Sequence, residues 1–225
     1  MTVKACPSEV PTSGAVPWRQ LRVAILLFDD VEVLDFAGPF EVFGVAKSPA
    51  GDPAFEVVTV ALDPGRVVAR NGLRIVPTFT TSCLEGADIL VIPGGLGTRR
   101  EMSRPAMLSF IRTASGSADM VLSVCTGALL LGAAGLLEDQ AATTHWAAMD
   151  ELRALDTGAE ILPDARVVDN GRLVVSAGVS AGIDAALHIV ARLLGRSQAD
   201  AAARAMQYDW TCADRGEPTV VTTQA

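Results

Sequence analysis

The 225-residue sequence is poor in aromatic, basic and histidine side chains. Phe, Trp and Tyr make up only 5% of the chain, so Val, Ile, Leu and Ala must build the core, drawn from the 50% of residues that are hydrophobic. The 18 lysines and arginines are outnumbered by 26 acidic residues, which gives a net charge of −8. This balance argues against nucleic acid as a partner, because phosphate binding needs a basic surface.

Several sequence signals are also missing. No apolar run reaches the ~20 residues that a membrane span needs, and residues 1–20 lack the apolar stretch of a signal peptide. We therefore expect a cytoplasmic protein with no membrane segment. There is no GxGxxG or Walker sequence, and neither His145 nor His188 has a cluster of Cys or acidic residues near it. We expect no cofactor and no metal.

The four cysteines are far apart and form no CxxC pair, which favours reduced thiols over a disulfide framework. Nothing in the sequence assigns a function to Cys6, Cys83 or Cys212. The fourth, Cys125, has a distinctive setting that is described below.

Strand and helix patterns alternate along the chain. Continuous apolar runs, typical of strands buried on both faces, occur at Arg22–Phe28, Phe55–Ala61, Ala87–Ile92 and Met120–Val124. Hairpins are predicted around Asn71-Gly72 and Asn170-Gly171, and helices at Pro39–Val45, Pro105–Ser115, His145–Leu155, Ser180–Leu194 and Ser197–Gln207. The alternation predicts an α/β fold with a mostly parallel sheet covered on both faces. We expect one domain, residues 21–210, between a flexible leader (1–20) and a tail (211–225).

The segment from Asp119 to Leu137 organises the chain. Its apolar run ends at Cys125, and small residues and a helical pattern follow, so we predict a strand, a sharp turn with cysteine at the corner, and a helix. The N–H groups of that helix should lower the pKa of the thiol. The alternative is a buried, inert cysteine.

Other groups should reach the same edge of the sheet, because ligands bind at the carboxyl ends of parallel strands. Asp35 follows the first strand, and its carboxyl could approach the Cys125 sulfur. Like-charge repulsion by a thiolate would then raise the pKa of Asp35 and suit it to acid–base work. An ordinary role as a helix N-cap is equally compatible with the sequence.

Two glycine-containing turns complete the predicted site. Gly94 and Gly95 follow a buried strand, and their N–H groups are candidates for an oxyanion hole, although an ordinary strand-to-helix turn has the same sequence. Thr126 offers an N–H and a hydroxyl beside the sulfur, unless the hydroxyl caps its own turn. Gly127 should let the helix start close to the strand.

The later candidates are less strongly indicated. His145 could be a base or a packed polar residue at a helix start, and Trp146 could line a pocket or belong to the core. Val179 lies in Ala177–Asp184, a segment that also reaches the expected edge. His188 lies one turn after Asp184, which predicts a simple side-chain pair without a catalytic role.

Four motifs in this order, IPGG, SVCTGALLLGAAGLL, ATTHW and SAGIDAALHIVARLLG, resemble the ThiJ/PfpI family of class I glutamine amidotransferase-like proteins. The resemblance extends from about Arg22 to Trp210. It implies a flavodoxin-like three-layer sandwich, a homodimer, and a reactive cysteine at the turn, here Cys125. Within the family, the chain most resembles the isonitrile hydratase group and the ligand-binding halves of AraC-type regulators, because both have a loop like the one containing Asp35 and an SVCTG turn.

This resemblance implies a cofactor-free lyase that hydrates a small-molecule isonitrile to an N-substituted formamide, with Cys125, Asp35 and Thr126 as catalytic residues. Thr126 stands where protease-like members have histidine, and Asp35 stands where relatives of the parkinsonism-linked protein have glutamate. Both differences count against protease and glyoxalase chemistry. A non-catalytic sensor of a small molecule or of oxidation, and glyoxalase-like activity on small aldehydes, remain the alternatives.

Overall fold

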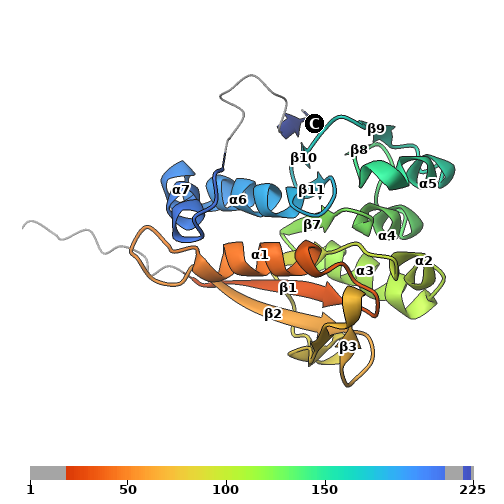
Figure 1. Cartoon of the computed structure of the whole chain (residues 1–225), viewed down its shortest axis with the longest axis horizontal. Helices are drawn as coiled ribbons and strands as arrows, with labels where there is room; N and C mark the ends of the chain where they lie inside the picture. The colour runs from red at the N-terminus through yellow and green to blue at the C-terminus, as the bar shows by residue number, and fades with distance from the viewer. Residues whose placement is uncertain (1–18, 211–219, 224–225) are drawn as a thin grey trace, which may run out of the picture.

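The computed structural model describes residues 19–210 and 220–223, which are built around one large sheet (Figure 1). Its eight strands lie in the order β12-β10-β11-β7-β6-β1-β2-β5, and every neighbouring pair is parallel except β10 with β11. The strands are β1 Leu21–Leu27, β2 Phe55–Ala61, β5 Phe79–Thr80, β6 Ile89–Ile92, β7 Met120–Val124, β10 Val167–Asn170, β11 Leu173–Ser176 and β12 Val220–Thr222. The prediction of a mostly parallel sheet is confirmed.

Two small two-stranded sheets are separate from the large one in their strand pairing. In the first, β3 (Val67–Val68) pairs with β4 (Arg74–Ile75), which confirms the hairpin predicted around Asn71-Gly72. In the second, β8 (Ala141–Ala142) pairs with β9 (Glu160–Ile161). The predicted hairpin around Asn170-Gly171 joins β10 to β11 in the large sheet.

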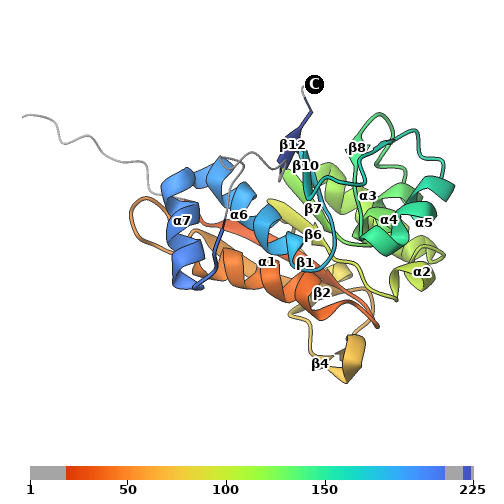
Figure 2. The ribbon, with the colours of Figure 1, turned by 45° about the horizontal axis from the view of Figure 1, so that its top comes forward.

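Helices cover both faces of the large sheet, as in a flavodoxin-like fold (Figure 2). One layer contains α1 (Val33–Val45), α6 (Ala181–Leu194) and α7 (Arg196–Ala205). The other contains α2 (Thr98–Glu101), α3 (Pro105–Ser117), α4 (Gly127–Ala133) and α5 (Met149–Ala154). Among the described residues, none of the helices combines the length and the apolar composition of a membrane span.

The three-layer arrangement explains why the central strands read as unbroken apolar runs. All four residues of β6 and all five of β7 are buried, because each strand face meets a helical layer. Aliphatic side chains dominate this core, with the Phe43–Phe55 edge-to-face pair among its few aromatic contacts. The sheet therefore holds the carboxyl ends of β1, β6 and β7 side by side on a rigid base.

The start of α1 differs from the prediction. The helix begins at Val33 and contains Pro39, whereas the sequence suggested a start at Pro39 itself. Proline lacks the N–H that would bond to the carbonyl of Asp35 four residues earlier, yet the first turn still forms ahead of it. The N-cap is Glu32, so the alternative reading of Asp35 as a cap is wrong and its carboxyl is available for another role.

Two further predictions need correction. Residues 220–222, assigned to a tail, form β12 and pair in parallel with β10. His188 does not pair with Asp184: its Nε2 lies 2.6 Å from Oδ2 of Asp169, and Asp184 instead accepts from Arg166 and Tyr208. In both cases the outcome is decided by a contact with β10, which the local sequence pattern does not show. Cys6, Cys212 and most of the predicted leader and tail lie outside the described residues.

Candidate functional site

Cys125 lies at the turn between β7 and α4, as predicted, and its backbone is held in the left-handed region at φ 57°. Its N–H donates to the carbonyls of Ser176 and Ala177 at 3.1 and 3.0 Å, and the buried Thr144 hydroxyl donates to its carbonyl at 2.8 Å. A non-glycine residue in this conformation is uncommon, and strained positions of this kind cluster at functional sites. These hydrogen bonds hold the thiol at the edge of the sheet.

The Asp35 carboxyl, from the first turn of α1, is fully buried beside this thiol. Oδ2 accepts a hydrogen bond of 3.0 Å from the Gly94 N–H. Oδ1 is buried but completes no hydrogen bond of good geometry with the described residues, although the Cys125 thiol and the Val179 N–H both act on the carboxyl. A buried carboxylate oxygen without a full partner is costly and needs an explanation such as a catalytic role.

Burial raises the pKa of Asp35 to about 7. The nearby charge of Glu32 adds to this rise, while hydrogen bonds from the Gly94 N–H, the thiol and the Val179 N–H oppose it. The predicted direction is confirmed, but the main cause is loss of solvent and not repulsion by a thiolate. A group with a pKa near neutrality can act as either acid or base at physiological pH.

The prediction for the thiol itself is wrong, because burial and the neighbouring Asp35 raise the pKa of Cys125 to about 12. The N–H groups of Thr126 and Val179 lower the pKa, but they do not outweigh the loss of water and the adjacent carboxylate. α4 is also only seven residues long. The resting site therefore holds a neutral thiol, whose proton must be removed when the sulfur attacks.

The threonine after the cysteine connects the two turns of the site. The Thr126 hydroxyl accepts from the Gly95 N–H at 2.9 Å and lies 3.1 Å from the Gly95 carbonyl, so it does not cap its own helix. The N–H groups of Gly94 and Gly95 are thus already bonded, to Asp35 and to Thr126. They position these two side chains and do not form the open oxyanion hole that we predicted from the sequence.

Gly94 has no room for a side chain, and we expect Gly94→Ala to lower the free energy of unfolding by about 2–3 kcal/mol. An added Cβ would lie 2.5 Å from the Thr126 nitrogen and 2.9 Å from Asp35 Oδ2. Gly116→Ala is the control, because a Cβ there on α3 meets nothing within 4 Å. Urea denaturation measures both variants, and equal effects would contradict the expected close packing at Gly94.

Gly127 also acts through packing. A Cβ at this position would lie 2.1 Å from the Ile92 carbonyl, so glycine lets α4 begin directly against β6. This close packing is a sufficient reason for glycine at position 127, as the sequence predicted.

The remaining predicted site residues are His145, Trp146 and Val179. The His145 ring packs against Gly178, where an added Cβ would come within 2.2 Å of it, and its Nδ1 accepts from the Ala147 N–H at 3.2 Å. Trp146 is 80% exposed, so it does not belong to the core. Val179 has φ 52°, unusual for a β-branched residue, and its N–H faces both Cys125 and Asp35.

Sequence reasoning missed two contributors. The Thr144 hydroxyl donates a hydrogen bond to the Cys125 carbonyl. Gly178 has no side chain, and this lets the His145 ring pack against the backbone next to Val179. Thr144 directly precedes His145 in the ATTHW motif, but nothing local shows that its hydroxyl reaches Cys125. Access to the site is narrow, because Cys125 is 6% exposed and none of four cavities found among the described residues has Cys125 or Asp35 in its lining.

The buried carboxyl has a consequence for stability. Its pKa rises from 3.8 to about 7 on folding, so the folded protein binds more protons than the unfolded chain between these values, and stability falls as pH rises through this window. Asp35→Asn should remove this loss. We expect the stability gained by Asp35→Asn to be roughly 3 kcal/mol larger at pH 8 than at pH 5. Urea denaturation at both pH values measures it, and an equal gain at both would contradict the raised pKa.

The sequence and the fold were compared with protein families, curated proteins and solved structures. The DJ-1/PfpI family model matches residues 21–192. Isonitrile hydratase from Pseudomonas putida is 39% identical over 188 residues, which cover 84% of this chain and 78% of the hydratase. The HTH-type transcriptional regulator GbdR from Pseudomonas aeruginosa is 26% identical over 83% of this chain, but the match covers only 50% of the regulator. The crystal structure of a ThiJ/PfpI family protein from Pseudomonas syringae has a TM-score of 0.77 at 35% identity, covering 92% of this chain and 84% of that one.

Proposed function

Because the chain belongs to the DJ-1/PfpI family, we propose that it hydrates a small isonitrile to an N-substituted formamide, with Cys125 as nucleophile and Asp35 as acid and base. The observation that carries this proposal is the buried Asp35 carboxyl, which lies beside the Cys125 thiol and whose Oδ1 completes no hydrogen bond with the described residues. Similarity to a hydratase supports the choice of substrate, and the narrow access favours a small one.

The first half of the reaction transfers the proton that the Asp35 carboxyl and the Cys125 thiol share. The Asp35 carboxylate takes the thiol proton as the sulfur adds to the terminal carbon of R–N≡C. Asp35 then gives this proton to the same carbon, which leaves the thioimidate R–N=CH–S bonded to Cys125. A general base with a pKa of about 7 suits both transfers at neutral pH.

Water enters in the second half. Asp35, again a carboxylate, takes a proton from water as the oxygen adds to the thioimidate carbon, and it delivers this proton to the substrate nitrogen. The C–S bond then breaks, the hydroxyl proton returns through Asp35 to the sulfur, and R–NH–CHO leaves. The N–H groups of Thr126 and Val179, which favour an ionised Cys125, stabilise the departing thiolate.

The substrate is tested by mixing the purified protein with methyl isonitrile and, separately, with methylglyoxal. We expect N-methylformamide to form and methylglyoxal to persist. Consumption of methylglyoxal without formamide production would replace the proposal with aldehyde chemistry. A non-catalytic sensor of a small molecule or of oxidation, the other alternative, would consume neither compound. Sensing of oxidation is disfavoured because the raised pKa of Cys125 leaves little thiolate to oxidise at neutral pH.

We also propose that the protein is a homodimer that associates through α1. The outward face of this helix exposes Leu34 and Phe40 at 37% and 40%, with Ala37 half-buried between them. Phe40→Lys should convert a dimer to a monomer in sedimentation velocity at micromolar concentration, because a charge would be buried in an apolar contact. Glu138→Lys, on the layer opposite α1, should stay dimeric. A monomeric wild type would rule the dimer out.

A further inference from the structure

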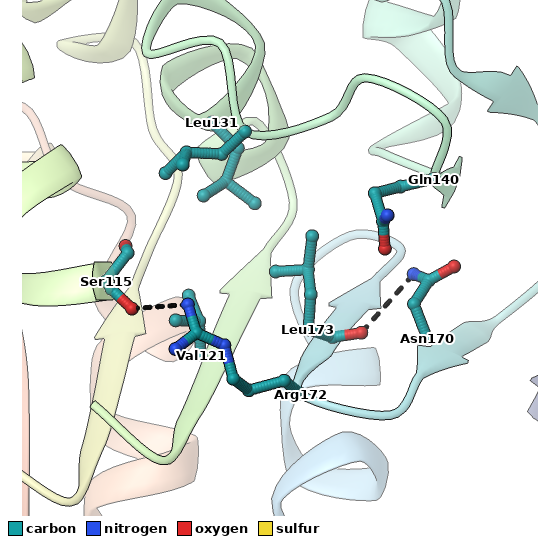
Figure 3. Close-up of a pocket in the computed structure, with 8 residues that line it drawn as sticks. Ser115, Val121, Leu131, Gln140, Asn170, Arg172 and Leu173 are labelled. Atoms are coloured by element: carbon teal, nitrogen blue, oxygen red, sulfur yellow. Dashed lines mark hydrogen bonds between the residues drawn. The ribbon is translucent and has the colours of Figure 1, made fainter. Parts of the chain in front are cut away.

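The hairpin of β10 and β11 is anchored at both of its ends. At the closed end, Arg172 donates to the Ser115 carbonyl at 2.7 Å, at the end of α3 (Figure 3). At the open end, the Ala177 N–H donates to the Arg166 carbonyl at 2.8 Å, which continues the ladder of the two strands. The Cys125 N–H donates in turn to the Ala177 carbonyl at 3.0 Å. The hairpin thus supports the segment that follows β11 and reaches the site.

The Val179 N–H in this segment faces both reacting groups. It favours the carboxylate form of Asp35 and the thiolate form of Cys125. Val179 gives its N–H this direction with φ 52°, a conformation that a β-branched residue rarely adopts. Such a conformation persists where the surrounding structure holds it, so the contacts of the neighbouring residues matter for the site.

Arg166 contacts this segment on both sides of Val179. On the N-terminal side, its carbonyl accepts from the Ala177 N–H. On the C-terminal side, its guanidinium donates to Ser180 Oγ at 3.2 Å and, through Nε, to Asp184 Oδ2 at 2.6 Å. Asp184 lies in the first turn of α6. One residue therefore links the end of β11 to the start of α6, with Val179 between the two links.

The Asp184 carboxylate is buried and bonded through both oxygens. Its Oδ2 accepts from Arg166, and its Oδ1 accepts from the Tyr208 hydroxyl at 3.0 Å. Charge-assisted hydrogen bonds of this kind are stronger than neutral ones, and two of them fix the orientation of the carboxylate. Among the described residues, the Tyr208 hydroxyl has no hydrogen bond to residues 177–180.

We propose that Arg166 is a positioning residue for the reaction. Through its backbone and its ion pair with Asp184, it keeps the Val179 N–H directed at the thiol and the carboxyl that react. What the two groups then do rests on the proposed function, but the position of the N–H can be measured without a substrate.

The state of the Asp35 carboxyl reports on this position. The titratable groups that act on it are the Cys125 thiol and Glu32, and the main causes of its raised pKa include neither Arg166 nor its carboxylate partner. The Val179 N–H lowers the pKa of Asp35. If the loop moves, the carboxyl should therefore keep its proton to a higher pH.

Arg166→Met should move the titration midpoint of Asp35 upward by about one pH unit, because one hydrogen bond to the carboxylate is lost. The ¹³C resonance of the Asp35 carboxyl, assigned by its absence in Asp35→Asn, gives this midpoint. With methyl isonitrile, kcat/KM at pH 7 should fall about tenfold, and its inflection should move with the NMR midpoint.

Tyr208→Phe is the matched control, because it removes one hydrogen bond of the same network and none to residues 177–180. It should lower the melting temperature and leave the midpoint of Asp35 unchanged. Arg166→Met also leaves the buried Asp184 charge without its cation, which is destabilising. The second variant therefore combines Arg166→Met with Asp184→Asn, and it should show the same upward shift.

An unchanged midpoint of Asp35 in the folded double variant would overturn the positioning role, whether or not the protein hydrates an isonitrile. An equal shift in Tyr208→Phe would also overturn it, since lost stability alone would then move the midpoint. A shift in the Arg166 variants of a protein that hydrates no isonitrile would support the positioning role and reject the proposed reaction.

Discussion

Cys125→Ala should lower isonitrile turnover by about 10⁴-fold or more, because the reaction loses its nucleophile together with the covalent intermediate. Formamide production, followed by NMR, is the measurement. The fold should remain intact, since the hydrogen bonds of Cys125 to Ser176, Ala177 and Thr144 use its backbone and survive in alanine. We therefore expect the melting temperature to change little.

Cys125→Ser is a second variant that tests the attack of the sulfur on the isonitrile. A hydroxyl keeps the shape of the site but is a much weaker nucleophile than a thiol, so turnover should again be nearly lost. Mass spectrometry of wild type mixed with a slowly hydrolysed isonitrile should show an adduct heavier by the mass of the substrate, and neither variant should form it. Turnover of Cys125→Ala within about tenfold of wild type would remove the sulfur from the mechanism.

The matched control is Cys83→Ala. Cys83 is an exposed free thiol, and hydrogen bonds from Thr80 and Ser82 lower its pKa. Thiol-directed reagents should therefore modify Cys83 before the buried Cys125, and inactivation by such reagents would not identify the nucleophile. Substitution identifies the nucleophile, because Cys83→Ala should retain full turnover while Cys125→Ala loses it.

Local sequence signals were sufficient to predict where Cys125 and Asp35 lie in the fold. The apolar run of β7 followed by small residues predicted the corner at Cys125, and the place of Asp35 just after β1 predicted that its carboxyl would reach the same edge. Both inferences depend on one rule, that parallel strands present their carboxyl ends together. The rule fixes where side chains gather and says little about their state.

The predictions that failed depend on contacts between distant segments. The pKa of Cys125 follows from its burial and from Asp35, which is 90 positions away in the chain, and these outweigh the local helix N–H groups. The Gly94 and Gly95 N–H groups looked free in sequence but are bonded to Asp35 and Thr126. β12 pairs with β10 across about fifty residues that give no local sign of the contact.

The pH dependence of turnover should follow the Asp35–Cys125 pair, which titrates as a unit. Only the form with a single proton shared between them can start the reaction, whether that proton is on sulfur or on the carboxyl. Below pH 7 both groups are protonated, so kcat/KM should fall about tenfold for each pH unit. Above pH 7 it should reach a plateau, because the pKa of Cys125 is about 12.

Asp35→Asn should lower kcat/KM by about 10²–10⁴-fold and remove the inflection near pH 7. Its residual activity should rise steadily with pH, since thiolate must then form without a base, and the pKa of Cys125 should fall once the Asp35 charge is gone.

Glu32→Gln is the matched control for Asp35→Asn. Removing this nearby charge should lower the pKa of Asp35, and with it the inflection, while keeping the plateau rate. A wild-type profile that is flat from pH 5 to pH 9, or that declines as pH rises through 7, would show that Asp35 is not the base, whatever the substrate proves to be.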